Sequence, residues 1–332
     1  MSSTDPKLDD DTRRTVWIAL VANVVIAAAK VAIGLVTASP AILSEAAHSS
    51  ADTLNEVLLL VSMARSRHRP DRVHPFGYGK ARYFYAMLAA VGIFVTGACF
   101  SFYQGVSTLF GGRGETELFG LGYAVLVLSL AADASSLLRA VYQASGAVPR
   151  GPRRLHRFLR TDRDPALATV LAEDSAAVVG VLLAAAGLFG HQLTGDTRWE
   201  GAASIGIAAL LTFAAFRLGR SAEALLIGQA APNLLVRDAY LTLADRPEVD
   251  TVLEFLTMRL GPDEILLAAR IDLADGMDSD GVEEACGRVK EALQQRFPAF
   301  EQIFLDITDA TARDRAVARK RRRLLESGGS LP

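Results

Sequence analysis

The chain has 332 residues, of which 51% are apolar and 22% charged, and its mean hydropathy is +0.25. A positive mean hydropathy over this length excludes a disordered chain and disfavours an ordinary soluble domain, so helices that cross a membrane are expected. The formal net charge of −2 excludes a globally basic protein that binds nucleic acid.

Six predominantly apolar runs are predicted to cross the bilayer, because an α-helix needs about 20 such residues to do so. The runs cover residues 16–37, 40–64, 83–110, 119–140, 165–189 and 201–216. The last of these runs is short by this criterion. We therefore expect a multi-pass α-helical membrane domain over residues 15–220, preceded by a short segment at residues 1–14.

Basic residues gather in two of the connections between these runs. The second-to-third and fourth-to-fifth connections contain Arg65, Arg67, Arg69, Arg72, Lys80, Arg82, Arg150, Arg153, Arg154, Arg157, Arg160 and Arg163. The connections on the opposite side carry at most one Lys or Arg each. Because basic loops stay preferentially in the cytoplasm, both termini are predicted to be cytoplasmic, in a protein of the cell membrane.

Beyond the sixth run, the pattern changes to that of a small soluble domain. It predicts a helix, two strands, a helix and a last strand, over residues 232–245, 251–260, 264–273, 280–297 and 302–307. These elements form one α+β module over residues 228–310. The remaining residues, 311–332, are predicted to be a basic and flexible tail, although a helix there is also consistent with the pattern.

The second run contains a polar stripe. Glu45, His48, Asp52 and Asn55 follow one another at spacings of three, four and three, so they share one face of a helix. An imidazole and a carboxylate one turn apart form half of a tetrahedral site for a divalent transition metal. The alternative is that His48 and Asp52 bond only to each other and hold helices together.

The fifth run contributes two adjacent carboxylates, Glu173 and Asp174. Like charges inside hydrocarbon repel each other, and a bound cation removes this difficulty. We expect one of the two to complete a metal site with His48 and Asp52, while the other faces a water-filled path. Because metal and protons compete for the same groups, such a site can exchange one for the other.

A further acid, Asp133, lies within the fourth run. It is interpreted either as an accessory proton or cation group, or as the pairing partner of Lys30 in the first run.

Together these residues resemble the cation diffusion facilitator family, the proton-coupled exporters of zinc, manganese, iron or cobalt. The second run contains His48-Ser49-Ser50-Ala51-Asp52, and the loop after it, residues 71–80, is similar to the family signature HPYGHGK. Within the family, the Glu-Asp pair of the fifth run resembles the zinc transporter 9-like branch. The resemblance implies six transmembrane helices followed by a ferredoxin-like cytoplasmic domain that forms a homodimer.

The resemblance also assigns roles to residues of the second-to-third loop. Asp71 and His74 match positions that bind an additional zinc ion, but Tyr78 replaces the histidine often found at the third position. The alternative for His74 is a residue at a helix start in a tight turn. Lys80 resembles a lysine that pairs with an acid beneath the sixth span, where this chain has Gly228.

The family comparison further implies a choice of metal. Glu173 in place of a histidine makes the site richer in oxygen and favours harder ions such as manganese, whereas the retained His48 favours Zn²⁺ as the transported substrate. No histidine follows His191, so the cytoplasmic domain is expected to dimerise without binding zinc tightly. Its acids Glu254, Asp272 and Asp306 are expected to be solvated.

The expected function is therefore export of zinc from the cytoplasm in exchange for protons, by alternating access in a homodimer, with no enzymatic activity and no cofactor. One alternative is a relative that does not transport and acts as a scaffold or regulator. An intramembrane metalloprotease is disfavoured because the sequence contains no His-Glu-x-x-His motif.

Overall fold

The computed structural model describes residues 6–111, 118–146, 165–327 and 329. The chain forms two compact units: the first contains Met1–Ser62 and Phe84–Ala222, and the second contains Met63–Tyr83 and Glu223–Pro332. The loop after the second predicted span therefore groups with the second unit, although the sequence suggested that it belonged to the membrane domain of residues 15–220. The basic residues predicted for the fourth-to-fifth connection lie outside the described residues.

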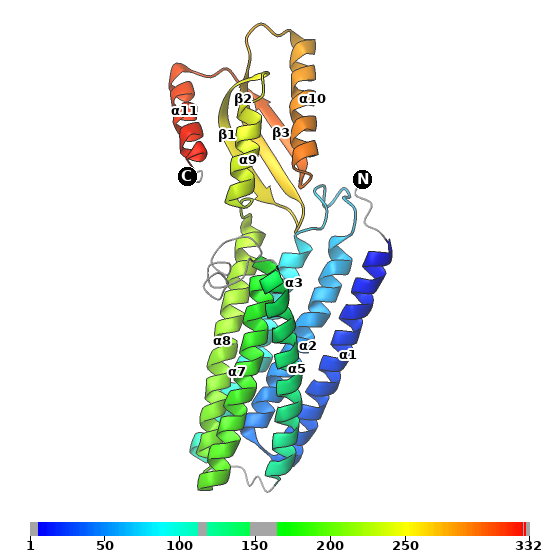
Figure 1. The fold of residues 1–332 in the computed structure, drawn as a ribbon, viewed down its shortest axis with the longest axis vertical. Helices are drawn as coiled ribbons and strands as arrows, with labels where there is room; N and C mark the ends of the chain where they lie inside the picture. The colour runs from blue at the N-terminus through cyan, green and yellow to red at the C-terminus, as the bar shows by residue number, and fades with distance from the viewer. Residues whose placement is uncertain (1–5, 112–117, 147–164, 328, 330–332) are drawn as a thin grey trace. The chain divides into compact units, whose positions relative to one another are not determined.

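Long helices make up the first unit. They are α1 (Pro6–Thr37), α2 (Pro40–Ser66), α3 (Ala81–Gly92), η1 (Ile93–Cys99), α4 (Phe100–Gly111), α5 (Phe119–Gly146), α7 (Pro165–Thr194) and α8 (Arg198–Ile227). The segment η1 is a π-helix, and it joins α3 and α4 into one continuous helical run. Figure 1 shows these helices running alongside one another. Each predicted apolar run thus corresponds to one long helical segment.

Four of the described helical segments are long and apolar enough to cross a membrane. They are Ala81–Gly111, Phe119–Tyr142, Glu173–Thr194 and Arg198–Ile227. The apolar part described for α1, Asn23–Thr37, is shorter, and α2 carries the polar stripe within its length. The sixth run, predicted to be short, belongs to a helix of 30 residues, so its length is sufficient for a span.

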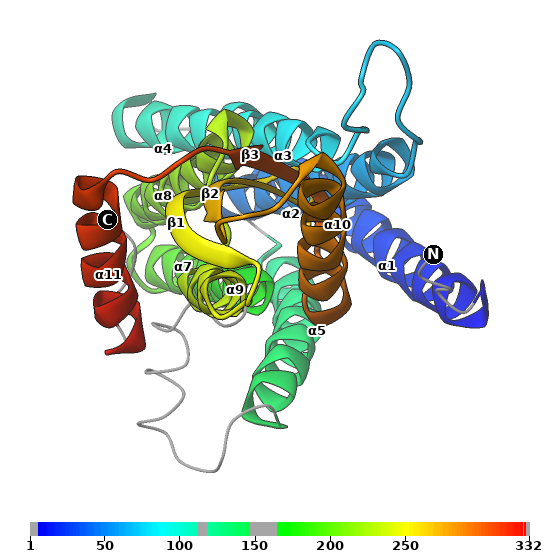
Figure 2. The same ribbon diagram turned by 90° about the horizontal axis from the view of Figure 1, so that it is seen from above.

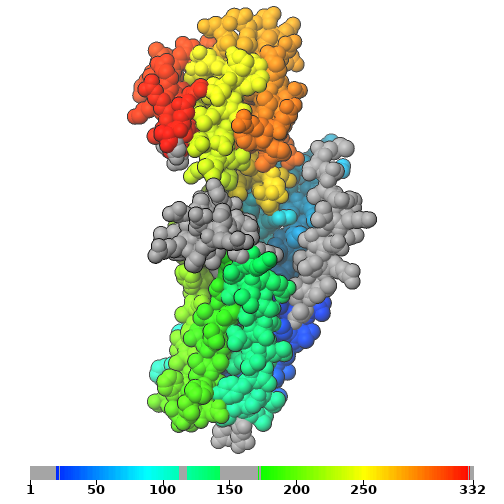
Figure 3. Space-filling model, in the orientation of Figure 1, coloured from blue at the N-terminus to red at the C-terminus, as the bar shows by residue number. Residues whose placement is uncertain are grey.

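Apolar side chains fill the contacts between these helices and also cover the outer surface of the first unit. Exposed examples are Val127 and Leu128 on α5, Leu182 and Phe189 on α7, and Phe213 and Phe216 on α8. Figure 3 shows part of this outer surface, where α5 and α7 lie side by side. An apolar surface of this extent is unfavourable in water and is typical of helices that face lipid.

Small residues on α7 allow the helices to approach closely. A Cβ atom at Gly187 of α7 would lie 3.0 Å from the backbone oxygen of Trp199 in α8. Ala184, one turn earlier, is fully buried. These contacts support tight packing between α7 and α8.

The second unit has the predicted order of elements. They are α9 (Asn233–Ala244), β1 (Val249–Arg259), β2 (Ile265–Leu273), α10 (Ser279–Arg296) and β3 (Phe300–Ile307). The sheet order is β1-β2-β3, with β2 antiparallel to β1 and parallel to β3. Figure 2 shows α9 and α10 on the same face of this sheet. Alternate residues of β2, such as Leu267 and Ile271, are buried beneath these helices.

Residues 312–326, predicted to belong to a flexible tail, instead form the helix α11 (Ala312–Glu326). Thr311 and Asp314 form a capping box at its start. Leu325 at its end is buried in the core of the unit, and Arg321 donates a hydrogen bond to the backbone oxygen of Leu253 in β1. Capping and these contacts explain why a basic segment is ordered here.

Candidate functional site

The polar stripe predicted on the second span lies on α2. The Ser39 hydroxyl accepts a hydrogen bond from the backbone N–H of Ile42, and Pro40 occupies the first helical position, so the sequence starts the helix there. His48 and Asp52 follow at helical spacing. The Nε2 atom of His48 lies 3.3 Å from Oδ2 of Asp52, with His48 buried and the Asp52 side chain partly exposed.

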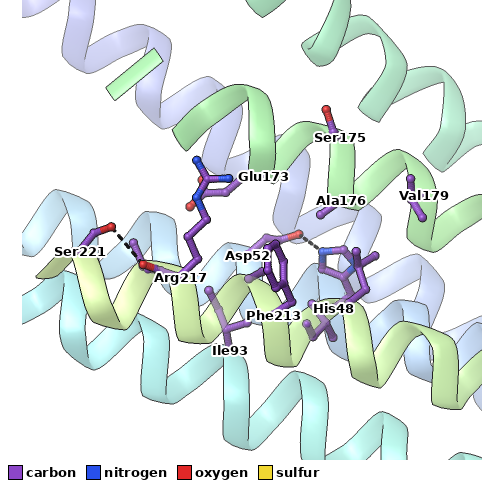
Figure 4. A pocket seen from close by; sticks show the side chains of 14 residues that line it. His48, Asp52, Ile93, Glu173, Ser175, Ala176, Val179, Phe213, Arg217 and Ser221 are labelled. Carbon is purple, nitrogen blue, oxygen red and sulfur yellow. Dashed lines mark hydrogen bonds and ion pairs between the residues drawn. The ribbon is translucent and has the colours of Figure 1, made fainter. Parts of the chain in front are cut away.

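The partly exposed side of this pair faces a pocket of about 240 Å³ within the first unit. Its polar lining comes from three helices: His48 and Asp52 of α2, Glu173 and Ser175 of α7, and Arg217 and Ser221 of α8. Apolar side chains such as Ile93 and Phe213 complete the wall. Figure 4 shows Asp52 beside His48 and the Arg217 side chain extending toward Glu173.

The two adjacent acids of α7 have different surroundings. Glu173 lines the pocket together with His48 and Asp52. Asp174 accepts a hydrogen bond of 3.1 Å from the hydroxyl of Ser136 on α5. Successive helical positions point about 100° apart, which explains why one carboxylate reaches the pocket and its neighbour reaches another helix.

The described residues do not contain three His, Cys, Asp or Glu side chains close enough to surround one ion. The His48–Asp52 pair is assembled, and Glu173 lines the same pocket without completing the set. A tetrahedral site generally uses at least three such protein ligands, and the described arrangement brings only two of them together.

Glu45, the first residue of the stripe, has a different partner. Its Oε2 atom lies 2.8 Å from Nζ of Lys30 on α1, and Lys30 also donates a hydrogen bond of 2.7 Å to Ser49. Lys30 and Glu45 are both buried. The pairing partner of Lys30 is thus Glu45, which corrects the alternative in which Lys30 pairs with Asp133.

Two further residues of the prediction lie beside the site. Asp133 of α5 is half-buried, within electrostatic reach of Lys30, Glu45 and Asp52. Asn55 lies half-buried on α2, one turn beyond Asp52, and is absent from the pocket lining. Neither residue lines the pocket. Their positions beside the site are compatible with accessory roles.

In the loop of the second unit, Asp71 and His74 do come together, and local hydrogen bonds account for their geometry. One Asp71 oxygen accepts from the backbone N–H groups of Val73 and His74, and the other accepts from the Tyr78 hydroxyl. The hydrogen bond from the backbone N–H of His74 lowers the pKa of the Asp71 carboxyl most, and the bond from the Tyr78 hydroxyl lowers it further. These bonds give the carboxylate a structural function in the turn.

Lys80, in the same loop, has a sulfur atom as its neighbour. Its Nζ atom lies 3.9 Å from Sδ of Met258 in β1. Gly228, which stands where the family pattern has an acid, adopts φ = +124°, and a Cβ atom there would lie 2.9 Å from the same sulfur. The packing of Met258 explains why a small residue occupies position 228.

The acids of the second unit pair with arginines. Arg270 lies between Glu254 and Asp306, with N–O distances of 3.5 and 2.7 Å. Asp272 accepts hydrogen bonds from Arg315 and from the backbone N–H of Ala310. These ion pairs provide a structural explanation for all three acids.

Sequence reasoning did not identify two groups of polar residues in the first unit. Arg217 and Ser221 line the pocket, and the pattern assigned them to the region after the sixth span. Near the other end of the helices, Glu200 accepts a hydrogen bond from Ser39, and its Oε1 atom lies 2.5 Å from Nδ1 of His191. The sequence signal for this second group is an acid, Glu200, directly before the apolar run of residues 201–216.

Comparison with known families adds an independent finding. The family model of the cation efflux transmembrane domain matches residues 16–227. This range contains the residues that line the pocket and the buried cluster around Glu200. The pocket, His48, Asp52 and Glu173 therefore lie within the matched domain.

Several curated proteins are similar to this chain, among them the following three. The human "Proton-coupled zinc antiporter SLC30A9, mitochondrial" is 32% identical over 237 residues, which cover 71% of this chain and 41% of that protein. "Metal tolerance protein C4" of Arabidopsis thaliana is 29% identical over 80% of this chain and 58% of its own length. "Manganese efflux system protein MneP" of Bacillus subtilis is 41% identical over 21% of this chain and 24% of its own length. The matches thus span less than two thirds of the length of each of these relatives.

Proposed function

Because this chain belongs to the cation diffusion facilitator family of cation efflux proteins, we propose that it exports a divalent metal ion, zinc foremost, in exchange for protons. The metal is the transported substrate, and it binds between α2 and α7. The observation that carries this proposal is the His48–Asp52 pair facing a pocket that Glu173 also lines.

Proton exchange follows from the chemistry of these three side chains. Neutral imidazole and ionised carboxylates bind metal, whereas their protonated forms do not. Metal taken up from the cytoplasmic side is released on the other side as protons occupy the same groups. The protein then returns with protons bound, which couples the two flows.

The pocket supports assignment of the described arrangement to the inward-facing state. It extends from His48 and Asp52 to Arg217 and Ser221, near the end of α8 that leads into the second unit. At the opposite end, Ser39, His191 and Glu200 are buried, and Glu200 contacts both of the others. Transport then requires this second end to open while the first end closes.

We further propose that all six long helical segments cross the cell membrane, with both termini in the cytoplasm, and that the second unit is a ferredoxin-like dimerisation domain. Its sheet has helices on one face. The other face exposes Leu256 of β1 and Phe304 of β3, which lie on either side of Ala268 in the strand register. An exposed apolar patch of this kind suits contact with a second copy.

The preference for zinc rests on His48, since imidazole suits zinc better than it suits manganese. The similar proteins include a zinc antiporter and a manganese efflux protein by their names. Glu173 adds an oxygen ligand, so manganese is the second metal to test. The loop residues Asp71 and His74 are proposed as structural, because both carboxylate oxygens are already bonded within the turn.

A relative that has lost transport is the second candidate function, motivated by the incomplete set of metal ligands in the described residues. Metal flux into proteoliposomes separates the two candidates. We expect zinc to move under an imposed pH gradient, Asp52→Ala to abolish this flux, and the exposed control Glu223→Ala to retain it. Absence of flux for zinc, manganese, iron and cobalt alike would favour the scaffold.

A further inference from the structure

A buried chain of charged side chains lies behind His48, on the side away from the pocket. Lys30 of α1 contacts Glu45 at 2.8 Å, and the other oxygen of Glu45, Oε1, lies 3.5 Å from Nδ1 of His48. On its opposite edge, the imidazole presents Nε2 to Asp52 at 3.3 Å. The ring of His48 therefore lies between two carboxylates from the same helix.

These two carboxylates differ in their access to the pocket. Asp52 and His48 line it, whereas Glu45 and Lys30 are absent from its lining. The Glu45 side chain is 1% exposed and the Lys30 side chain 2%. Lys30 thus provides the positive charge that a buried carboxylate requires, and Glu45 stays out of the path of the transported ion.

Two facing atoms in this chain have no hydrogen-bond partner. Among the described residues, Oε1 of Glu45 and Nδ1 of His48 are both buried and unpaired at hydrogen-bond distance. Buried polar groups in native proteins nearly always find a partner, and an unpaired one is costly. The short approach needed to join these two atoms satisfies both at once.

We propose that Glu45, held by Lys30, is a positioning residue that accepts a hydrogen bond from Nδ1–H of His48 and directs the Nε2 lone pair toward the metal. This inference rests on the proposed function. A histidine that binds metal commonly donates its other ring N–H to a carboxylate, which fixes the ring orientation and the tautomer. The Lys30–Glu45 pair supplies such a carboxylate from outside the pocket.

Gly180 on α7 supports this arrangement from the opposite side. A Cβ atom at this position would collide with Oε1 of Glu45 and would lie 3.1 Å from Nδ1 of His48. The absent side chain leaves room for the hydrogen bond between these two atoms. A larger residue at position 180 is therefore expected to disturb the contact between these two atoms, although Gly180 contributes no ligand.

Co²⁺ is a suitable probe, because its visible absorption reports both binding and coordination geometry in the full-length protein. We expect Glu45→Ala to weaken Co²⁺ binding by about 10–100-fold and to alter the spectrum. The double variant Lys30→Met with Glu45→Gln removes both charges and keeps an oxygen acceptor for Nδ1–H. It is expected to keep the wild-type spectrum and to lose no more than about fivefold in affinity.

A second pair of variants distinguishes an effect on the His48–Glu45 contact from a general effect of replacing a helical glycine. Gly180→Ala is expected to weaken Co²⁺ binding and to raise the zinc KM while the kcat of transport stays close to wild type. Gly206→Ala on α8 is the matched control, since its Cβ atom would meet Leu183 at an ordinary 3.4 Å. Its affinity and KM are expected to be unchanged.

The outcomes distinguish this inference from the proposed function. Folded Glu45→Ala protein that binds Co²⁺ with the wild-type affinity and spectrum overturns the positioning role and leaves the transport site intact. A double variant as defective as Glu45→Ala also overturns it, because the acceptor oxygen would then be irrelevant. If the wild-type protein itself neither binds Co²⁺ nor transports zinc, the proposed function fails and this inference fails with it.

Discussion

At the residue scale, the adjacent acids Glu173 and Asp174 show how position decides chemistry. Both are carboxylates in one apolar helix, and the sequence offers no means to choose between them. The structure directs Glu173 to the pocket and Asp174 to the hydroxyl of Ser136. Only the contacts with neighbouring helices make this distinction.

This difference leads to a prediction for isosteric variants. Glu173→Gln removes the negative charge of a proposed metal ligand from the pocket, so its zinc flux in proteoliposomes is expected to fall at least about 100-fold. Asp174→Asn keeps an oxygen that accepts from Ser136, so its flux is expected to stay within about threefold of wild type. The reverse order of the two effects would show that Asp174 is the ligand.

Sequence reasoning could place His48, Asp52 and Glu45 on one face because helical periodicity is a local property. It could not pair Lys30 with Glu45, since these residues belong to different helices and their contact depends on how α1 packs against α2. For the same reason it offered Asp133 as a partner of Lys30. Contacts within one helix follow from spacing, whereas contacts between helices require the fold.

At the element scale, the ends of the helices opposite the pocket are joined by Glu200. This residue contacts Ser39, before α2, and His191, near the end of α7. All three are buried. The cluster thus ties three helix ends together without touching the proposed metal site.

Removal of the central acid is predicted to destabilise the bundle. Glu200→Ala leaves buried partners without hydrogen bonds, which costs about 1–3 kcal/mol, so the thermal midpoint of the detergent-solubilised protein is expected to fall. The exposed residue Glu223 provides the control, and Glu223→Ala is expected to leave the midpoint unchanged. An equal response of the two variants would contradict a stabilising role for the cluster.

The helix α11 allows a prediction about pH. Arg315 donates a hydrogen bond to Asp250 and another to Asp272, linking α11 to β1 and β2. The hydrogen bond from Arg315 lowers the pKa of the Asp250 carboxyl most, and the hydrogen bond from the Thr251 hydroxyl lowers it further. A lowered pKa in the folded state means that the contribution is present above the unfolded value and is lost as pH falls through the folded value.

We therefore expect acid to loosen α11. Hydrogen exchange in α11 should accelerate as pH drops below the usual aspartate range, after correction for the intrinsic pH dependence of exchange. Arg315→Ala should exchange faster at neutral pH and respond less to acid. The surface ion pair Arg322–Glu326 provides the control, because Glu326→Gln leaves the Arg315 bonds intact. An unchanged acid response in Arg315→Ala would contradict this explanation.

The element order of both units could be predicted, because hydrophobic period and turn residues are local signals. The π-helix Ile93–Cys99 could not, since its hydrogen-bond pattern inside an apolar run leaves no compositional mark. The sequence pattern left both a flexible tail and a helix open for the segment that forms α11. Its buried anchor, Leu325, is a single apolar residue among basic neighbours.

At the scale of the whole molecule, the apolar content of 51% is an average over two different surroundings. The first unit exposes apolar side chains along its long helices, while the second has a conventional core between a sheet and its helices. The grouping of Met63–Tyr83 with the second unit was not predictable, because a loop carries no sequence signal for the unit against which it packs.

The open face of the sheet leads to a prediction about assembly. Leu256 is 58% exposed, and replacing it by Asp places a charge on the face proposed to meet a second copy. We expect Leu256→Asp to shift the purified protein from dimer toward monomer in light scattering, since a buried unpaired charge is strongly unfavourable. Glu291→Ala, at an exposed position of α10 on the other side of the sheet, serves as the control. A dimer that survives Leu256→Asp would place the interface elsewhere.

In the proposed mechanism, metal and protons share the site formed by His48, Asp52 and Glu173. Its most direct test is to impose a zinc gradient across proteoliposomes without a pH gradient and to record zinc and internal pH together. Protons are expected to move against zinc, and Asp52→Ala is expected to abolish both flows. Zinc flux without proton movement, or coupled flux that persists in Asp52→Ala, would contradict it.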